Sequence, residues 1–112
     1  MGGRARRAAA TPVRIELQPA AVDDVSAAID YYDRARHGLG QEFLTELDRL
    51  LARLSEFPLG SQSVEGYDTV RRARMRRFPY AVFYSTDGTD LIGVLRIIHT
   101  ARDLESWSHE HA

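Results

Sequence analysis

The chain has 112 residues, of which 44% are hydrophobic and 28% are charged, and its formal net charge is -1 with neutral histidines. This composition is ordinary for a single globular domain. The net charge is not positive, so the overall charge gives no indication that the protein binds nucleic acid. The absence of cysteine excludes disulfides and thiolate zinc sites. No apolar run approaches the roughly 20 residues of a membrane helix.

Residues 1–12 are rich in glycine, alanine and arginine and lack the apolar core of a secretory signal. We expect them to form a flexible basic tail, with a nucleic-acid-binding arm as the alternative. Residues 13–107 are expected to form a single domain, followed by a C-terminal tail at 108–112.

The first predicted elements are a strand and a helix. Residues 13–17 alternate apolar and charged side chains, as a half-buried strand does. The helix is predicted to begin at Pro19, where a missing N–H costs nothing, and to end before Gly38. Asp23 and Asp24 would lie in its first turn, where negative charge complements the helix dipole.

A second helix is predicted from near Leu39 to Pro58. Its apolar residues recur at spacings of three and four, which places them on one face. The connection between the two helices is very short, so we expect an antiparallel helical hairpin.

The second half of the chain predicts a loop at 59–69 and then three strands. Their approximate ranges are Val70 to Arg77, Tyr80 to Ser85, and Leu91 to His99. The Asp87-Gly88 pair is a strong hairpin-turn signal, and the continuous apolar run of the last strand indicates a central position. The order β-α-α-β-β-β predicts an α+β fold of two layers, with the helical hairpin on one face of an antiparallel sheet.

The most unusual segment carries five arginines between residues 71 and 77, and all 15 basic residues of the chain are arginine. Alternation along a strand would bury Ala73 and Met75 under the helices. Arg72, Arg74 and Arg76 would then stand together on the open face, where they would attract phosphates or carboxylates. Arginines that protect an edge strand are the alternative interpretation.

Arg96 lies within the apolar run of the last predicted strand, where a charge needs a partner or an opening to solvent. We expect either a carboxylate partner, with Asp103 or Glu105 the simplest choice, or a place in the basic surface.

The sequence resembles the ParE/RelE toxins of type II toxin–antitoxin systems, and within them the ParE, or plasmid-stabilisation, branch. The likeness runs from about Val13 to Trp107, and it is carried by the segments Ile29–Tyr32, Gly38–Leu44, Arg76–Tyr84 and His99–Asp103. The resemblance implies the same strand–helix–helix–three-strand layout that the periodicity predicts.

The resemblance implies one of two activities. ParE-like members inhibit DNA gyrase by binding, whereas RelE-like members cut mRNA on the ribosome. Arg72, Arg74, Arg76 and Arg96 would contact the target or its phosphates in either case. RNA cleavage also needs a proton carrier, for which His99 and Tyr84 are weak candidates, because the lysines of many RelE-like nucleases are absent.

Both candidates also have structural interpretations, which we favour. His99 would close a strand end by bonding to the backbone, and Tyr84 would be a packed strand aromatic. The lack of a clear acid–base pair favours gyrase inhibition over RNA cleavage, and a degenerate, non-toxic binding module is a third possibility.

The resemblance further implies a cognate, ParD-like antitoxin as partner. The lack of cysteine is compatible with a reducing cytoplasm, which is the location we expect, and we expect no cofactor. Arg102 and Trp107 are possible target contacts, although Trp107 is better explained as an anchor for the C-terminal segment. His109 and His111 lack a third rigid ligand, so we expect no metal site.

Overall fold

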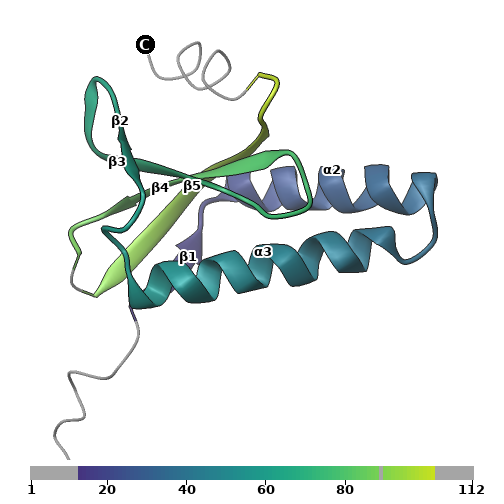
Figure 1. Cartoon of the computed structure of the whole chain (residues 1–112), viewed down its shortest axis with the longest axis horizontal. Helices are drawn as coiled ribbons and strands as arrows, with labels where there is room; N and C mark the ends of the chain where they lie inside the picture. Colours follow the sequence, from purple (N-terminus) through teal and green to yellow (C-terminus); the bar gives the residue numbers. More distant parts are fainter. Residues whose placement is uncertain (1–12, 89, 103–112) are drawn as a thin grey trace, which may run out of the picture.

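In this computed structural model, residues 13–88 and 90–102 are described. They form β1 (Arg14–Leu17), α2 (Pro19–Ala35), α3 (Leu39–Glu56), β2 (Gln62–Val64), β3 (Tyr67–Arg74), β4 (Tyr80–Thr86) and β5 (Leu91–His99) (Figure 1). The predicted tails and Trp107 lie outside the described residues. No helix in the described ranges has both the length and the apolar character needed to cross a bilayer.

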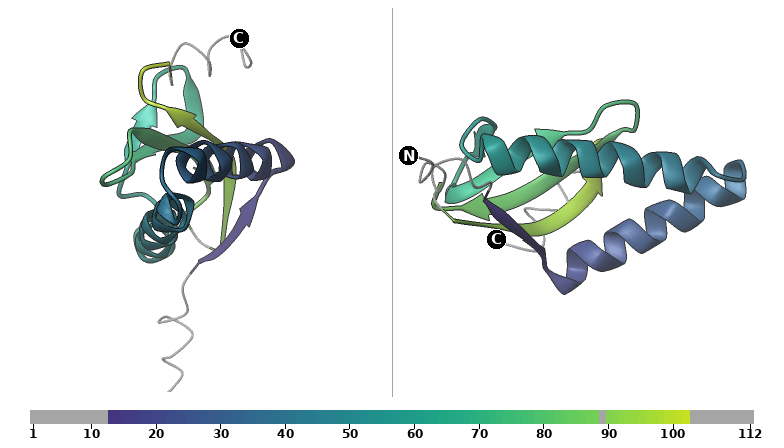
Figure 2. Two further views of the ribbon diagram at one scale, coloured as in Figure 1. Left: turned by 90° about the vertical axis from the view of Figure 1, so that its right-hand side faces the viewer. Right: turned by 90° about the horizontal axis from the view of Figure 1, so that it is seen from below.

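The strands form one five-stranded sheet in the order β1-β5-β4-β3-β2. β2 to β5 are antiparallel neighbours, and β1 lies parallel to β5 at one edge. The helical hairpin packs on one face of this sheet, and its tip projects beyond the strands (Figure 2). The predicted two-layer α+β class is therefore confirmed, and β5 has the predicted bounds and a strand on each side.

Two local predictions were wrong. The predicted loop at 59–69 contains β2, which pairs with β3 through a turn where Gly66 has a φ of 86°. β3 ends at Arg74 rather than Arg77, because Arg77 adopts a left-handed φ of 70° and Pro79 has no N–H for a ladder.

The two helices approach closely where the hairpin begins its return. Gly38 has a φ of 88°, which lets the chain reverse between α2 and α3. The N–H of Gly40 donates a 2.8 Å hydrogen bond to Asp33 Oδ1. A Cβ on Gly40 would lie 2.7 Å from the carbonyl oxygen of Ile29, so only glycine fits without a shift.

The main core lies between the helices and the sheet. It includes an aromatic cluster that joins α2 and α3 to β4 and the β3–β4 connection, in which Phe43 and Phe78 are buried and Tyr32 and Tyr80 are partly buried. Phe43 lies 5.4 Å from Phe78 and 5.2 Å from Tyr80 between ring centroids. These distances are typical of favourable edge-to-face pairs, so the cluster fixes the β3–β4 connection against the hairpin.

The opposite face of the sheet is less open than the sequence predicts. It carries a second buried cluster of Val64, Val70, Ala81, Phe83 and Ile98. Both faces of the central strands are therefore apolar, which agrees with the continuous apolar run of β5.

Candidate functional site

Arg72 and Arg74 lie where strand alternation predicts. They share a face with Val70 of the second cluster, whereas Ala73 is buried in the main core. Arg74 is exposed and Arg72 is half-buried. Two of the predicted arginines therefore flank the side of the sheet that faces away from the helices.

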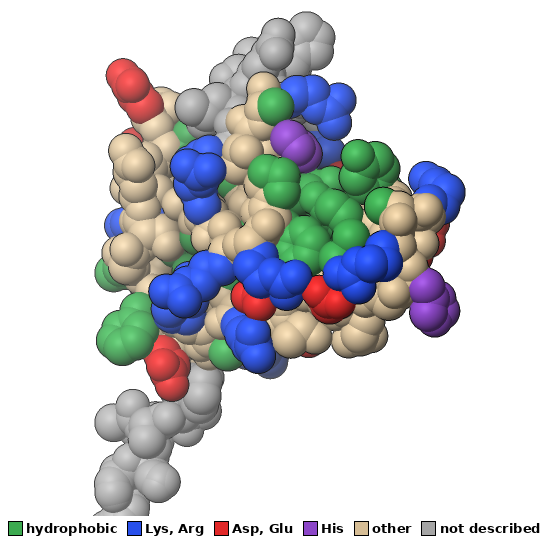
Figure 3. Space-filling view, turned by 45° about the vertical axis from the view of Figure 1, so that its right-hand side comes forward, with side chains coloured by type: hydrophobic (Ala, Val, Ile, Leu, Met, Phe, Trp, Pro, Cys, Tyr) green, Lys and Arg blue, Asp and Glu red, His purple; other side chains and the backbone are tan. Residues whose placement is uncertain are grey.

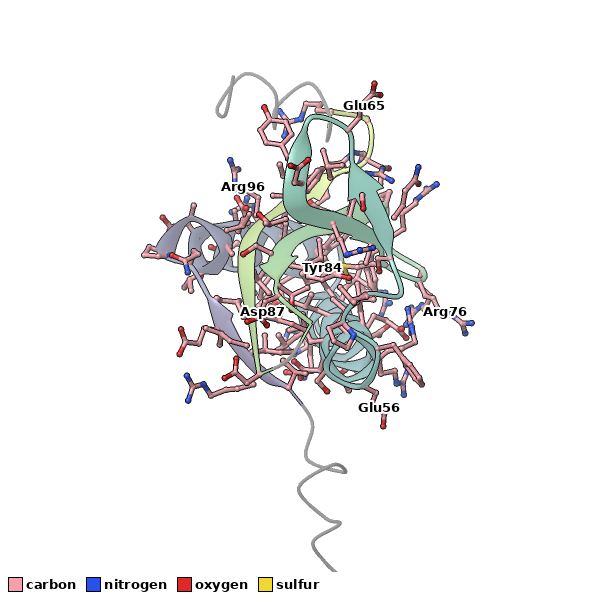
Figure 4. The ribbon with its side chains drawn as sticks, turned by 90° about the vertical axis from the view of Figure 1, so that its left-hand side faces the viewer. Glu56, Glu65, Arg76, Tyr84, Asp87 and Arg96 are labelled. Carbon is pink, nitrogen blue, oxygen red and sulfur yellow. The ribbon has the colours of Figure 1, made fainter. Side chains whose placement is uncertain are left out.

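Arg76 does not join them. It follows the end of β3 and lines a small cavity with Glu46, Arg49 and Arg53 of α3. The prediction of three arginines on one face is therefore wrong, because Arg76 belongs to the turn between β3 and β4, which lies against α3. Figure 4 places Arg76 and Arg96 on opposite sides of the molecule.

Arg96 is paired within the fold, and its partner is neither Asp103 nor Glu105. Its Nε and Nη2 donate hydrogen bonds of 2.7 and 3.0 Å to the two carboxylate oxygens of Asp24. Oδ2 of Asp24 also accepts a 2.9 Å bond from the N–H of Ile97. Because α2 begins at Pro19, Asp24 lies beyond the first turn, and it fixes α2 to β5 instead of complementing the dipole.

The two candidate proton carriers, Tyr84 and His99, differ in how accessible they are to solvent. Tyr84 is fully buried in the main core (Figure 4), and its hydroxyl donates a 2.9 Å bond to the carbonyl of Pro58. His99 ends β5, and its Nδ1 accepts a 3.1 Å bond from the N–H of Ala101. Both positions agree with the structural interpretations made from the sequence.

An open groove of about 810 Å³ lies between α2 and the sheet. We call it the tyrosine groove, and its lining includes Tyr31, Tyr32, Tyr80, Arg96, His99 and Arg102. α2 forms one wall, and the 79–80 turn and the end of β5 form the other. Figure 3 shows hydrophobic side chains gathered in this region, with arginine side chains along their border.

The lining of the groove combines aromatic and charged side chains. The exposed fraction of Tyr31 is 60%, and the ring of His99 lies 5.3 Å from that of Tyr80. Burial raises the pKa of Tyr32 and of Tyr80 above the ordinary value of 10.0. These phenols therefore stay protonated at neutral pH and present hydrogen-bonding hydroxyls on apolar rings, which suits docking of another protein.

The sequence did not single out Tyr31, Tyr32 or Asp24 as site residues. Tyr31 and Tyr32 belong to Ile29–Tyr32, one of the segments that carry the family resemblance. The sequence therefore marked these residues as typical of the family, but it did not indicate that they line a groove. Of the predicted target contacts, Arg102 lines the groove. No group of three or more metal-ligating side chains occurs within residues 13–88 and 90–102.

Comparison with known families decides the assignment. Residues 15–104 match the model of the ParE toxin of the type II toxin–antitoxin system, parDE. The chain belongs to the ParE toxin family. No curated protein matches it.

A solved structure supports the ParE fold. The structure titled "Chromosomal ParDE TA system from P. aeruginosa" superposes with a TM-score of 0.67 at 18% sequence identity. The match covers 78% of this chain and 95% of the other. At this identity the likeness concerns the fold alone.

Proposed function

We propose that this ParE-family toxin inhibits DNA gyrase in the cytoplasm by binding, and that a ParD-like antitoxin neutralises it. The family match supports the toxin–antitoxin setting. The observation that carries gyrase binding over RNA cleavage is the state of the residues that cleavage would need. Tyr84, one of the two candidate proton carriers, is buried with its hydroxyl bonded to the carbonyl of Pro58, and Arg96 is already paired with Asp24.

The target is tested by two parallel incubations of the purified chain. One contains gyrase and supercoiled DNA, and the other contains translating ribosomes and mRNA. We expect gyrase-dependent DNA breaks or loss of supercoiling in the first and no cuts in the second. Codon-positioned RNA cuts would instead assign a ribonuclease, with His99, Tyr80 and Arg102 of the groove as the residues to examine.

Arg72 and Arg74 are the predicted target contacts that share a face. Reversing both charges with R72E and R74E is expected to abolish inhibition while circular dichroism shows an unchanged fold. The matched control is R14E with R34E, which reverses two exposed charges on β1 and α2. If the two double variants lost inhibition equally, the effect would be one of overall charge, and a specific role of Arg72 and Arg74 in target contact would be excluded.

The tyrosine groove is the proposed antitoxin site. An amphipathic segment that folds on binding would place apolar residues against Tyr31 and Tyr80 and an acidic residue near Arg102. The variant Y31A should weaken capture of a ParD-like antitoxin by a factor of ten or more. The control F57A removes an equally exposed aromatic ring (64% against 60%) outside the groove and should bind normally.

A further inference from the structure

A second cavity, of about 250 Å³, lies between α3 and the β3–β4 connection. Four arginines line it, namely Arg49, Arg53, Arg76 and Arg77, together with Glu46 and Leu50. We call it the arginine pocket. Four guanidinium groups and one carboxylate give it a formal charge of +3, in a chain whose net charge is -1. Positive charge is therefore concentrated at this site in a chain that is close to neutral overall.

Two of the arginines are fixed by acidic side chains. Arg49 Nη1 lies 2.9 Å from the buried Glu46 Oε2, and Arg77 Nη1 lies 3.9 Å from the same oxygen. Arg77 Nη2 also donates a 2.8 Å bond to Glu42. These contacts hold the wall of the pocket in place. They also pair both nearby carboxylates, those of Glu42 and Glu46, with Arg49 and Arg77.

The other two arginines, Arg53 and Arg76, are the ones available to attract an anion. Arg53 and Arg76 are exposed, and neither side chain has an ion-pair or hydrogen-bond partner among the residues that the structure describes. Arg49 and Arg53 lie one turn apart on α3, a rise of about 6 Å. Phosphates along one strand of a duplex rise about 3.4 Å each, so side chains at this spacing can reach separate phosphates.

The lining indicates which anion fits. Arginine presents a planar fork that binds phosphate oxygens bidentately. No aromatic ring from residues 13–88 or 90–102 lines the pocket, so bases of a single strand have nothing there to stack on. Among the same residues, Leu50 is the only apolar side chain in the lining, which leaves little to hold the side chains of an acidic peptide.

We propose that the arginine pocket binds phosphate groups of a double-stranded nucleic-acid backbone, independently of base sequence. This goes beyond the proposed function, because it needs neither gyrase nor an antitoxin. The interaction would be weak alone, with a dissociation constant on the order of 10⁻⁴–10⁻⁶ M at physiological salt.

The test measures fluorescence anisotropy of a labelled DNA duplex of mixed sequence against the full chain over a series of salt concentrations. The variant R53Q/R76Q removes the two arginines without a described partner. Each lost phosphate contact lowers the salt slope by about 0.9, so we expect a slope smaller by about 1.8 and binding about 30-fold weaker at physiological salt. R53K/R76K should keep most of the slope, since the charge remains.

The control R14Q/R34Q also removes two exposed charges but leaves the arginine pocket intact, and it should bind like the wild type. Residues 1–12 are unchanged in every variant, so their three arginines cannot mimic the expected loss. Wild-type binding by R53Q/R76Q overturns the proposal. So does a variant that keeps DNA binding but loses binding of labelled poly-glutamate, which would assign the pocket to an acidic peptide.

Discussion

Asp24 of α2 accepts hydrogen bonds from Arg96 and from the N–H of Ile97, and so ties the first helix to β5. The exposed fractions of the two side chains are only 19% for Arg96 and 16% for Asp24. The pair therefore lies in a poorly solvated position at the edge of the tyrosine groove, where a lost partner would leave a costly unpaired charge.

We predict that D24N lowers the free energy of unfolding by about 2–3 kcal/mol, because it leaves the Arg96 guanidinium with a weaker, neutral acceptor. The melting temperature should fall by about 10 °C or more. Thermal and urea denaturation followed by circular dichroism would measure both. The neighbouring exposed Asp23 supplies the control D23N, which should change stability by less than about 0.5 kcal/mol.

Arg77 is the only described residue other than glycine with a positive φ, at 70°. Because this conformation disfavours a Cβ, R77G should be more stable than R77A by about 1 kcal/mol, although both lose the bond to Glu42. Urea denaturation of the two variants makes the comparison. An alanine variant as stable as the glycine variant would show that the turn relaxes.

Glu42 accepts hydrogen bonds from Arg77 and Arg36. Chiefly the bond from Arg77 holds its carboxyl pKa below the ordinary value of 4.5. A depressed pKa contributes stability above 4.5, and that contribution is lost as the pH falls through the folded-state pKa. A carbon-detected NMR titration should show the low pKa in the wild type and a rise towards 4.5 in R77Q. An unchanged pKa in R77Q would assign the shift to Arg36.

Gly40 is expected to be intolerant of substitution. In G40A the new methyl group would meet the carbonyl oxygen of Ile29 at 2.7 Å and Asp33 Oδ1 at 2.8 Å. The two helices must then separate, at a cost of about 1–3 kcal/mol. Gly93 provides a matched control, because its nearest neighbour would lie at 3.4 Å, an ordinary contact. The same denaturation experiment should find G93A close to the wild type and G40A clearly weakened.

The sequence by itself determined the secondary structure of the helical hairpin and of the central strand. Apolar spacing placed both helices, and the apolar run of Leu91–His99 gave the bounds of β5. These features depend on side-chain periodicity within one element, which is visible in the sequence. The burial of Ala73 and Met75 followed from the same periodicity.

Only the tertiary structure decided where the functional arginines lie. The partner of Arg96 is 72 residues away in the chain, and no local pattern marks it. Arg76 lines the arginine pocket because it lies beyond the end of β3, in a turn whose position against α3 no strand pattern could predict. The tyrosine groove likewise combines α2, the 79–80 turn and the end of β5, and packing between distant segments, rather than periodicity, brings these together.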